Sequence, residues 1–345
     1  MMTGRSFRLM ICAAVTFFLA ACNVLPSTAS PTPSGVPIQP VVQPTASPTP
    51  RPVPTETLAP TQTRPPAQTA LPTLAPTIPP APTQVPTLAP AFDITKRPGP
   101  LPVDSFASYV QWMQANTSVG YDYLVSRWTR AQAIFSNKDI TDPRVLEAFL
   151  RTPREAFFRN SGPAQAYEDA VFSIGYGQTI TGPHLVSRMT QAINPQLNHR
   201  VLEIGTGSGF QSAVLSELAN YVYTIEIVPE LAQQADARYT AMTKAYPEYA
   251  NIKRKLADGY YGWEEYAPFD RIIVTAGIDH VPPELLAQLA PDGIMVIPVG
   301  PPSGQTILKI SKQVQKDGSI TFAREDIYHG YKITFVPFTG DHQDK

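Results

Sequence analysis

The chain has 345 residues, a formal net charge of −1 and a sequence pI of about 6.5, so its overall charge does not resemble that of a basic nucleic-acid-binding protein. Its length suits one or two domains. Proline is unevenly distributed, because 23 of the 38 prolines lie between Pro26 and Pro102. Composition therefore divides the chain into two unlike parts.

The first residues have the pattern of a bacterial secretion signal. Two arginines precede the apolar run Leu9–Ala21, which is too short for an ordinary membrane-spanning helix. The residues Leu19–Cys22, "LAAC", resemble the lipobox of bacterial lipoproteins, in which cleavage precedes a cysteine that then carries lipid. We expect residues 1–21 to be a lipoprotein signal peptide and Cys22 to be the lipidation site. This implies an extracytoplasmic protein, lipid-anchored to a membrane of the bacterial cell envelope; a plain secretory signal is the alternative.

Residues 22–102 consist largely of proline, threonine, alanine and serine. Proline lacks an amide hydrogen and fixes φ, so neither helix nor sheet can propagate through such a sequence. Bulky apolar residues are also too few to form a core. We therefore predict a disordered, lipid-anchored stalk with a polyproline II bias, followed by one folded domain at 103–345.

The remaining sequence predicts helices and then alternating strands and helices. Apolar residues at helical spacing occur within 104–117, 121–135 and 141–158, and Asp142 is the candidate N-cap of a helix beginning at Pro143. Strands are then expected at Arg200–Ile204, Tyr221–Ile227, Ile252–Leu256, Arg271–Thr275 and Gly293–Pro298, and helices at Gly209–Ala219, Pro229–Tyr246 and Pro282–Leu289. Such alternation indicates an α/β fold with a mostly parallel sheet and helices on both faces. We expect the segments 306–315, 319–328 and 331–338 to be β-structure, with a hairpin turn at Asp317–Gly318.

A glycine-rich turn follows the first of these strands. The run Glu203–Gly209 reads "EIGTGSG", and glycine lets a ligand lie close to the main chain at the start of a helix. The spacing departs from the dinucleotide pattern G-x-G-x-x-G, because Phe210 occupies the third glycine position. The run instead resembles motif I of the Rossmann-like S-adenosylmethionine (SAM) methyltransferases, where this turn holds the methionine part and the ribose.

Two acidic residues downstream fit the same resemblance. Glu226 ends the next strand, and parallel strands bring their carboxyl ends to one edge of the sheet, where its carboxylate could accept hydrogen bonds from both ribose hydroxyls. Asp258 and Gly259 follow the third strand, where this fold contacts the adenine amino group. Taken alone, Glu226 would be a solvated strand-end charge and Asp258 a turn residue. The predicted cofactor-binding residues are Glu203, Gly205, Thr206, Gly207, Ser208, Gly209, Glu226, Asp258 and Gly259.

Several motifs in one order make the resemblance more specific. They lie at Pro153–Phe157, Ile174–Ile180, Val201–Gly209, Asp258–Gly262, Pro268–Ala276 and Ile297–Gly300. Together they resemble the protein-L-isoaspartate O-methyltransferase family, which repairs isomerised Asp and Asn residues. The resemblance implies a Rossmann-like sheet with an N-terminal helical segment and a C-terminal β extension. It also implies that SAM is the cofactor and that methyl is transferred to the free carboxylate of L-isoaspartyl residues in damaged proteins or peptides.

One position departs from the family pattern. The family usually has serine after Gln-Thr-Ile, and that hydroxyl is its assigned active-site group, whereas this chain has Thr181. Threonine keeps the hydroxyl but adds a methyl group and restricts χ1. We expect Thr181 to be catalytic, with Ile180, Gly182, Pro183 and His184 in the acceptor site. An N-cap for the following helix is the structural alternative for Thr181, and a purely structural role is the alternative for His184.

Two other functions are compatible with parts of the sequence. One is a surface module that binds isoaspartyl or other peptides with little turnover, and the other is a SAM methyltransferase for a different carboxylate or small molecule. The SAM motif argues against the first, and the family-like segment before it argues against the second. The five histidines are scattered without metal-ligand spacing, so we expect no metal. The expected partners are isoaspartyl proteins or peptides and, through Cys22, a membrane, and we expect no nucleic acid.

Overall fold

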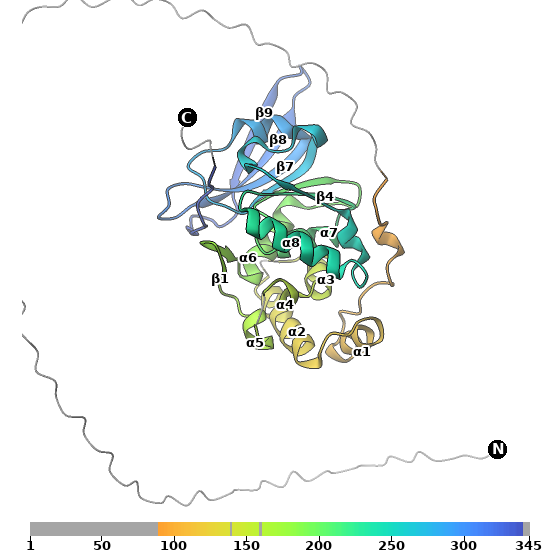
Figure 1. Cartoon of the computed structure of the whole chain (residues 1–345). Coiled ribbons are helices and arrows are strands. Elements are labelled where there is room, and N and C mark those ends of the chain that lie inside the picture. The colour runs from red at the N-terminus through yellow and green to blue at the C-terminus, as the bar shows by residue number, and fades with distance from the viewer. Residues whose placement is uncertain (1–88, 139, 159–160, 341–345) are drawn as a thin grey trace, which may run out of the picture. The chain divides into compact units, whose positions relative to one another are not determined.

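The computed structural model describes residues 89–138, 140–158 and 161–340 (Figure 1). The predicted signal peptide, the predicted lipidation site at Cys22 and the stalk up to residue 88 lie outside these ranges. Among the helices within them, none is both long enough and apolar enough to cross a membrane.

A seven-stranded sheet in the order β5-β4-β3-β6-β7-β8-β9 forms the centre of the domain. The strands β5, β4, β3, β6 and β7 are parallel, and β8 and β9 continue the sheet antiparallel. This confirms the mostly parallel sheet and the C-terminal β extension. The strands are β3 (Arg200–Ile204), β4 (Tyr221–Glu226), β5 (Ile252–Leu256), β6 (Phe269–Val274), β7 (Leu289–Val299), β8 (Thr306–Val314) and β9 (Ile320–Asp326).

Helices cover both faces of this sheet and bury its central strands on both sides. Val201 and Val222 belong to one apolar cluster, which includes residues of α1–α3 and α6–α8, while their neighbours Leu202 and Tyr223 belong to a second cluster that includes Leu285 of α9. Burial on both faces explains why the strands read as nearly continuous apolar runs. The longer helices are α1 (Phe106–Asn116), α2 (Tyr121–Ser136), α3 (Pro143–Arg151), α6 (Pro183–Ile193), α7 (Phe210–Ser216), α8 (Pro229–Met242) and α9 (Pro283–Gln288), and the one-turn helices are α4 (Arg154–Phe157) and α5 (Pro163–Ala166).

The N-terminal helical segment is confirmed, including the predicted start of α3. The Asp142 side chain accepts a hydrogen bond from the N–H of Arg144 at 2.9 Å, with Pro143 as the first helical residue. Other boundaries differ. The predicted helix at 209–219 is shorter because its end tightens into a turn in which the N–H of Leu218 donates to the carbonyl of Leu215.

The last predicted strand is the largest departure in the fold. Residues 331–338 form only isolated bridges, Gln305 with Ile333 and Gly277 with Pro337. Pro337 has no amide hydrogen and cannot continue a ladder. A two-stranded hairpin that the sequence did not predict, β1 (Phe172–Gly175) with β2 (Gln178–Ile180), lies within the segment before α6.

Residues 92–101, which composition placed in the stalk, contact the folded domain (orange in Figure 1). Phe92 donates from its N–H to Asn251 at 2.8 Å and accepts from the Asn251 amide at 2.7 Å, and the N–H of Ile94 donates to Asn220 at 3.2 Å. Arg97 pairs with the buried Glu217. Asn220 and Asn251 directly precede β4 and β5, so this segment lies at the amino edge of the sheet.

Candidate active site

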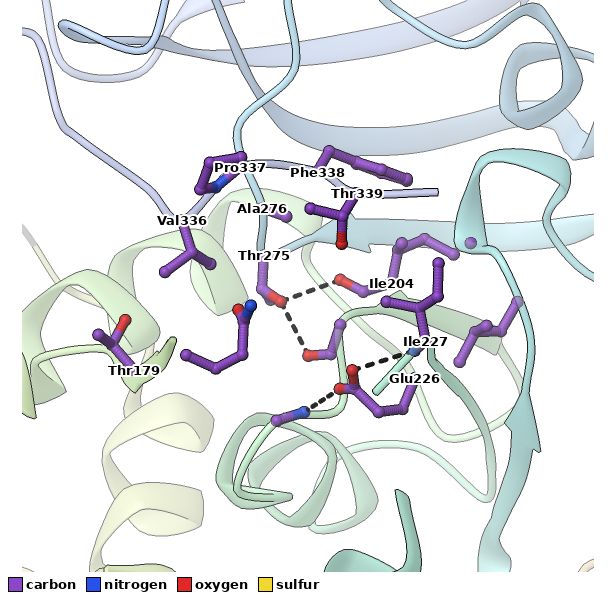
Figure 2. Close-up of a pocket in the computed structure, with 15 residues that line it drawn as sticks. Thr179, Ile204, Glu226, Ile227, Thr275, Ala276, Val336, Pro337, Phe338 and Thr339 are labelled. Carbon is purple, nitrogen blue, oxygen red and sulfur yellow. Dashed lines mark hydrogen bonds between the residues drawn. The ribbon is translucent and has the colours of Figure 1, made fainter. Parts of the chain in front are cut away.

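A cleft lies at the opposite edge, where the strands β3, β4 and β6 have their carboxyl ends (Figure 2). The space between its walls, part of which is open to solvent, is about 540 Å³. Its walls come from those strand ends, from the β1–β2 hairpin and from the C-terminal segment. The lining residues are Gln178, Thr179, Ile204, Gly205, Gly207, Ile225, Glu226, Ile227, Gly259, Thr275, Ala276, Val336, Pro337, Phe338 and Thr339.

Two glycines of the turn, Gly205 and Gly209, lie where a side chain would clash with its neighbours. Gly205 has φ +96°, and a Cβ there would lie 2.4 Å from Oγ1 of Thr275. The Thr275 hydroxyl lies 2.9 Å from the carbonyl of Ile204 and 2.8 Å from that of Gly205, so it closes the turn from the side of β6 (Figure 2). Gly209 has φ +91° and would place a Cβ 2.6 Å from the hydroxyl of Tyr239. These contacts, besides the left-handed backbone, require glycine here.

Glu226 ties the end of β4 to the glycine turn. One carboxylate oxygen accepts from the N–H of Gly207 at 2.7 Å, and the other accepts from the N–H of Ile227 at 3.0 Å (Figure 2). The second oxygen also accepts from the N–H of Val228 at 2.9 Å. The side chain is buried but lines the cleft. Because each carboxylate oxygen can accept more than one hydrogen bond, Glu226 keeps acceptor capacity toward a ligand.

Glu203 is fully buried beneath the turn. Its Oε2 accepts from the hydroxyls of Ser212 and Thr224, so it joins β3, β4 and α7. Burial raises the pKa of Glu203 to about 8, which keeps the carboxyl protonated at neutral pH. Its Oε1 has no hydrogen-bond partner within the described chain.

A second cavity adjoins the cleft and shares part of its wall. Thr179, Gly205, Gly207 and Thr275 line both. The second cavity has a volume of about 460 Å³, part of it open to solvent, and brings Thr181 into one space with the glycine turn. Its other lining residues are Ile180, Val186, Met189, Glu203, Thr206, Ser208, Phe210, Gln211 and Phe335.

The turn around Thr181 is held by its backbone. Its carbonyl accepts a hydrogen bond from Nη2 of Arg154 at 2.8 Å. Thr181 does not cap α6, because the carboxylate of Asp169 accepts from the N–H of His184 at 2.9 Å instead. Within the described ranges no hydrogen bond to the Thr181 hydroxyl is present, and the side chain is half-buried at the cavity wall. This leaves the hydroxyl available for a ligand.

Some predicted site residues lie beside the two cavities rather than in their walls. Gly182 and Pro183 are buried at the start of α6, and His184 is half-buried there. Asp258 accepts from the N–H of Tyr260 at 2.9 Å and packs against Gly340. Gly209 caps α7. In the parts of the chain that the structure describes, no group of three or more His, Cys, Asp or Glu side chains could hold a metal ion.

Sequence reasoning missed the C-terminal wall of the cleft. Gly277, which follows β6, donates to the carbonyl of Val336 and accepts from the N–H of Phe338, both at 2.8 Å, and the N–H of Phe335 donates to Gln305 at 2.9 Å. These bonds place Val336–Thr339 over the carboxyl ends of the strands (Figure 2). The sequence predicts only β-structure at 331–338, although Pro337 is a signal against a regular strand.

Comparisons with known proteins agree on one family. A model of the Protein-L-isoaspartate(D-aspartate) O-methyltransferase family matches residues 130–343. Protein-L-isoaspartate O-methyltransferase 2 of Nitrosococcus oceani is 41% identical over 206 residues, which cover 60% of this chain and 89% of that protein. Protein-L-isoaspartate O-methyltransferase of Picosynechococcus sp. is 49% identical over 163 residues, 47% of this chain and 71% of that protein.

Solved structures share the fold. A protein-L-isoaspartate O-methyltransferase with 25% identity has a TM-score of 0.53 over 62% of this chain and 66% of that one. A putative member from Plasmodium falciparum, solved with S-adenosyl-L-homocysteine, has 22% identity and a TM-score of 0.51, covering 61% of this chain and 97% of that one. The motifs, the sheet and the family match give one conclusion: the chain belongs to the protein-L-isoaspartate(D-aspartate) O-methyltransferase family.

Proposed function

We propose that this chain transfers the methyl group of SAM to the free carboxylate of L-isoaspartyl residues in damaged proteins or peptides, and so serves protein repair. One observation carries the proposal: the glycine turn and the Thr181 turn line the same cavity. The first belongs to the cofactor motif and the second to the predicted acceptor site. Family membership and the names of the relatives supply the acceptor class.

The cleft fits SAM by the chemistry of its walls. The glycine turn offers a backbone that a ligand can approach closely, and Glu226 has acceptor capacity for ribose hydroxyls. Gly259 lines the cleft next to Asp258, at the predicted adenine end. Gly205, Gly207, Glu226 and Gly259 would therefore hold the cofactor. When bound, SAM supplies a methyl group that its sulfonium has already activated.

The acceptor side needs positioning more than proton transfer. An isoaspartyl carboxylate is ionised near neutral pH, so no strong general base is required. The Thr181 hydroxyl can donate a hydrogen bond that orients this carboxylate. The apolar side chains of Ile180, Val186 and Met189 line the second cavity and restrict the entry of water. Holding two reactants in the right geometry supplies much of the acceleration in such a reaction.

A matched pair of peptides tests the reaction. The purified chain is incubated with SAM labelled in its methyl group and with peptides that differ only in isoaspartate or aspartate at one position. We expect a base-labile methyl ester on the isoaspartyl peptide alone. Equal labelling of both peptides, or no labelling while calorimetry shows SAM binding, would contradict the acceptor assignment.

We also propose that the chain is lipid-anchored in the bacterial cell envelope. Support comes from the lipobox-like Leu19–Cys22 and from the proline-rich composition that follows it. Cys22→Ser should move the protein from the membrane fraction to the soluble fraction of cells. Cys12→Ser is the matched control, because it lies within the predicted signal peptide and should leave the protein in the membrane fraction. A Cys22→Ser variant that fractionates like the parent would rule out this anchor.

A further inference from the structure

Arg154 is a fully buried cation that forms no ion pair with an acidic side chain of the described residues. It is 0% exposed, and in the described chain no carboxylate accepts a hydrogen bond from it. Its Nη1 has no partner there either. Burial lowers the pKa of Arg154 to about 9, so the guanidinium remains a cation at neutral pH. Burying an unpaired cation is costly, so its other contacts need an explanation.

Those contacts join the turn around Thr181 to the wall of the second cavity. Nε donates to the carbonyl of Ala166 at 2.9 Å, and Nη2 donates to the carbonyl of Thr181 at 2.8 Å. The guanidinium also lies 4.7 Å from the centre of the Phe210 ring, which lines the cavity at the start of α7. The planar fork of arginine can hold two carbonyls in a fixed relation, which a lysine cannot.

A buried network fixes Arg154 from behind. Its backbone N–H donates to the Tyr167 hydroxyl at 3.2 Å, and that hydroxyl also accepts from Nε of Arg127 at 2.7 Å. Tyr167 donates to Glu155, which forms an ion pair with Arg127 at 2.9 Å. The neighbouring carboxylate is therefore used by Arg127, and Arg154 is left to bind the two carbonyls.

The chemistry favours an indirect role for this cation. An acceptor carboxylate loses its negative charge as it is methylated, so a cation paired directly with it would stabilise the reactant more than the transition state. Arg154 instead binds the backbone carbonyl of Thr181. It can hold the hydroxyl in place without an ion pair to the acceptor.

We propose that Arg154 is a positioning residue that fixes the Thr181 carbonyl and thereby the direction of the Thr181 hydroxyl in the cavity. This inference rests on the proposed methyl transfer and adds a residue whose side-chain hydrogen bonds reach the Thr181 turn. A change at Arg154 should therefore affect the acceptor site more than cofactor binding, because the hydrogen bond from Arg154 to Thr181 does not involve Glu226 or the glycine backbone.

Arg154→Lys in the full chain tests the proposal, because it keeps the charge but cannot hold both carbonyls. We expect kcat for the isoaspartyl peptide to fall about 10- to 100-fold, because a small misplacement of the reacting groups can slow a reaction by this much. The peptide KM and the SAM Kd should stay within about twofold of the parent values, the pattern of a lost transition-state interaction. An unchanged kcat, or a SAM Kd that rises as much as kcat falls, would overturn the proposal.

Arg130→Lys is the matched control, because Nε of Arg130 donates to the carbonyl of Tyr167 at 2.6 Å on the same segment, and in the described chain Arg130 makes no hydrogen bond to Thr181. Lysine also keeps a positive charge near Asp169, which lies 4.0 Å from Arg130. This control should keep kcat near the parent value; an equal loss in both variants would show general loosening instead. Amide hydrogen exchange of residues 179–184 should be faster in Arg154→Lys than in the parent or the control. This readout needs no methyl transfer, so an inactive parent would refute the proposed function while unchanged exchange would refute the role of Arg154.

Discussion

Glu226 and Gly207, 19 residues apart in sequence, meet at 2.7 Å where the carboxylate accepts the amide hydrogen of the glycine turn. The contact arises because β3 and β4 are parallel neighbours whose carboxyl ends share one edge. One carboxylate therefore both shapes the turn and lines the cleft. Its removal should affect cofactor binding in two ways, through lost hydrogen bonds to the ligand and through a less ordered turn.

Glu226→Ala should weaken SAM binding by about 1–3 kcal/mol, the usual consequence of losing a buried hydrogen-bonding partner. Isothermal calorimetry with SAM measures the change directly. Glu230→Ala is the control, because Glu230 is exposed on the first turn of α8 and does not line the cleft. Equal affinities for the parent and Glu226→Ala would exclude Glu226 from the cofactor site.

Thr181→Ala should lower kcat by about 10²-fold while leaving the SAM Kd unchanged, because a hydroxyl that orients a reacting oxygen acts mainly in the transition state. Thr181→Ser restores the hydroxyl without the methyl group and should recover most of the rate. Initial rates with the isoaspartyl peptide distinguish these variants. If alanine and serine variants lose activity equally, side-chain volume rather than the hydroxyl matters at this position.

The glycine turn and Glu226 could be located from sequence because each depends on local pattern plus one rule of parallel sheets. Three glycines after an apolar strand define the turn, and a strand-end carboxylate must reach the same edge. The spacing also distinguishes this turn from a dinucleotide-binding turn, because Phe210 occupies the position of the third glycine. The environment of Glu203 is harder to predict from sequence. Its position in the motif does not reveal that its carboxyl group is buried and accepts hydrogen bonds from Ser212 and Thr224.

The remaining features depend on contacts between distant segments. The C-terminal wall forms because Val336 and Phe338 bond to Gly277, about 60 residues away, and nothing local in either segment specifies that pairing. Arg154 was part of a recognised motif, but its bond to Thr181 required the fold. The contacts of residues 92–101 were hidden for another reason: their composition continues that of the proline-rich segment.

Glu203 should make stability depend on pH. Its folded-state pKa of about 8 lies above the ordinary value of 4.5, so between these values the folded protein keeps a proton that the unfolded chain releases. The stability contributed by this group is complete below about pH 4.5 and is lost as pH rises toward 8. Glu203→Gln removes the titration, so its free energy of unfolding should fall less between pH 5.5 and 8.5 than that of the parent. Urea unfolding at both pH values gives the comparison, and parallel losses would contradict the buried, protonated state.

Asn251 offers a test of the amino-edge contacts that is independent of the active site. Its side chain exchanges two hydrogen bonds with Phe92, and it lies at the edge of the sheet opposite the cleft. Asn251→Ala should lower the free energy of unfolding by about 1–3 kcal/mol, because it leaves the amide and the carbonyl of Phe92 without their partners. SAM affinity and methyl transfer should stay at parent values, since the 92–101 segment contacts neither cavity.

Asn137→Ala, at an exposed position after α2, controls for the substitution itself. A loss of SAM binding in Asn251→Ala would instead show that the amino edge and the cleft are coupled through β4 and β5.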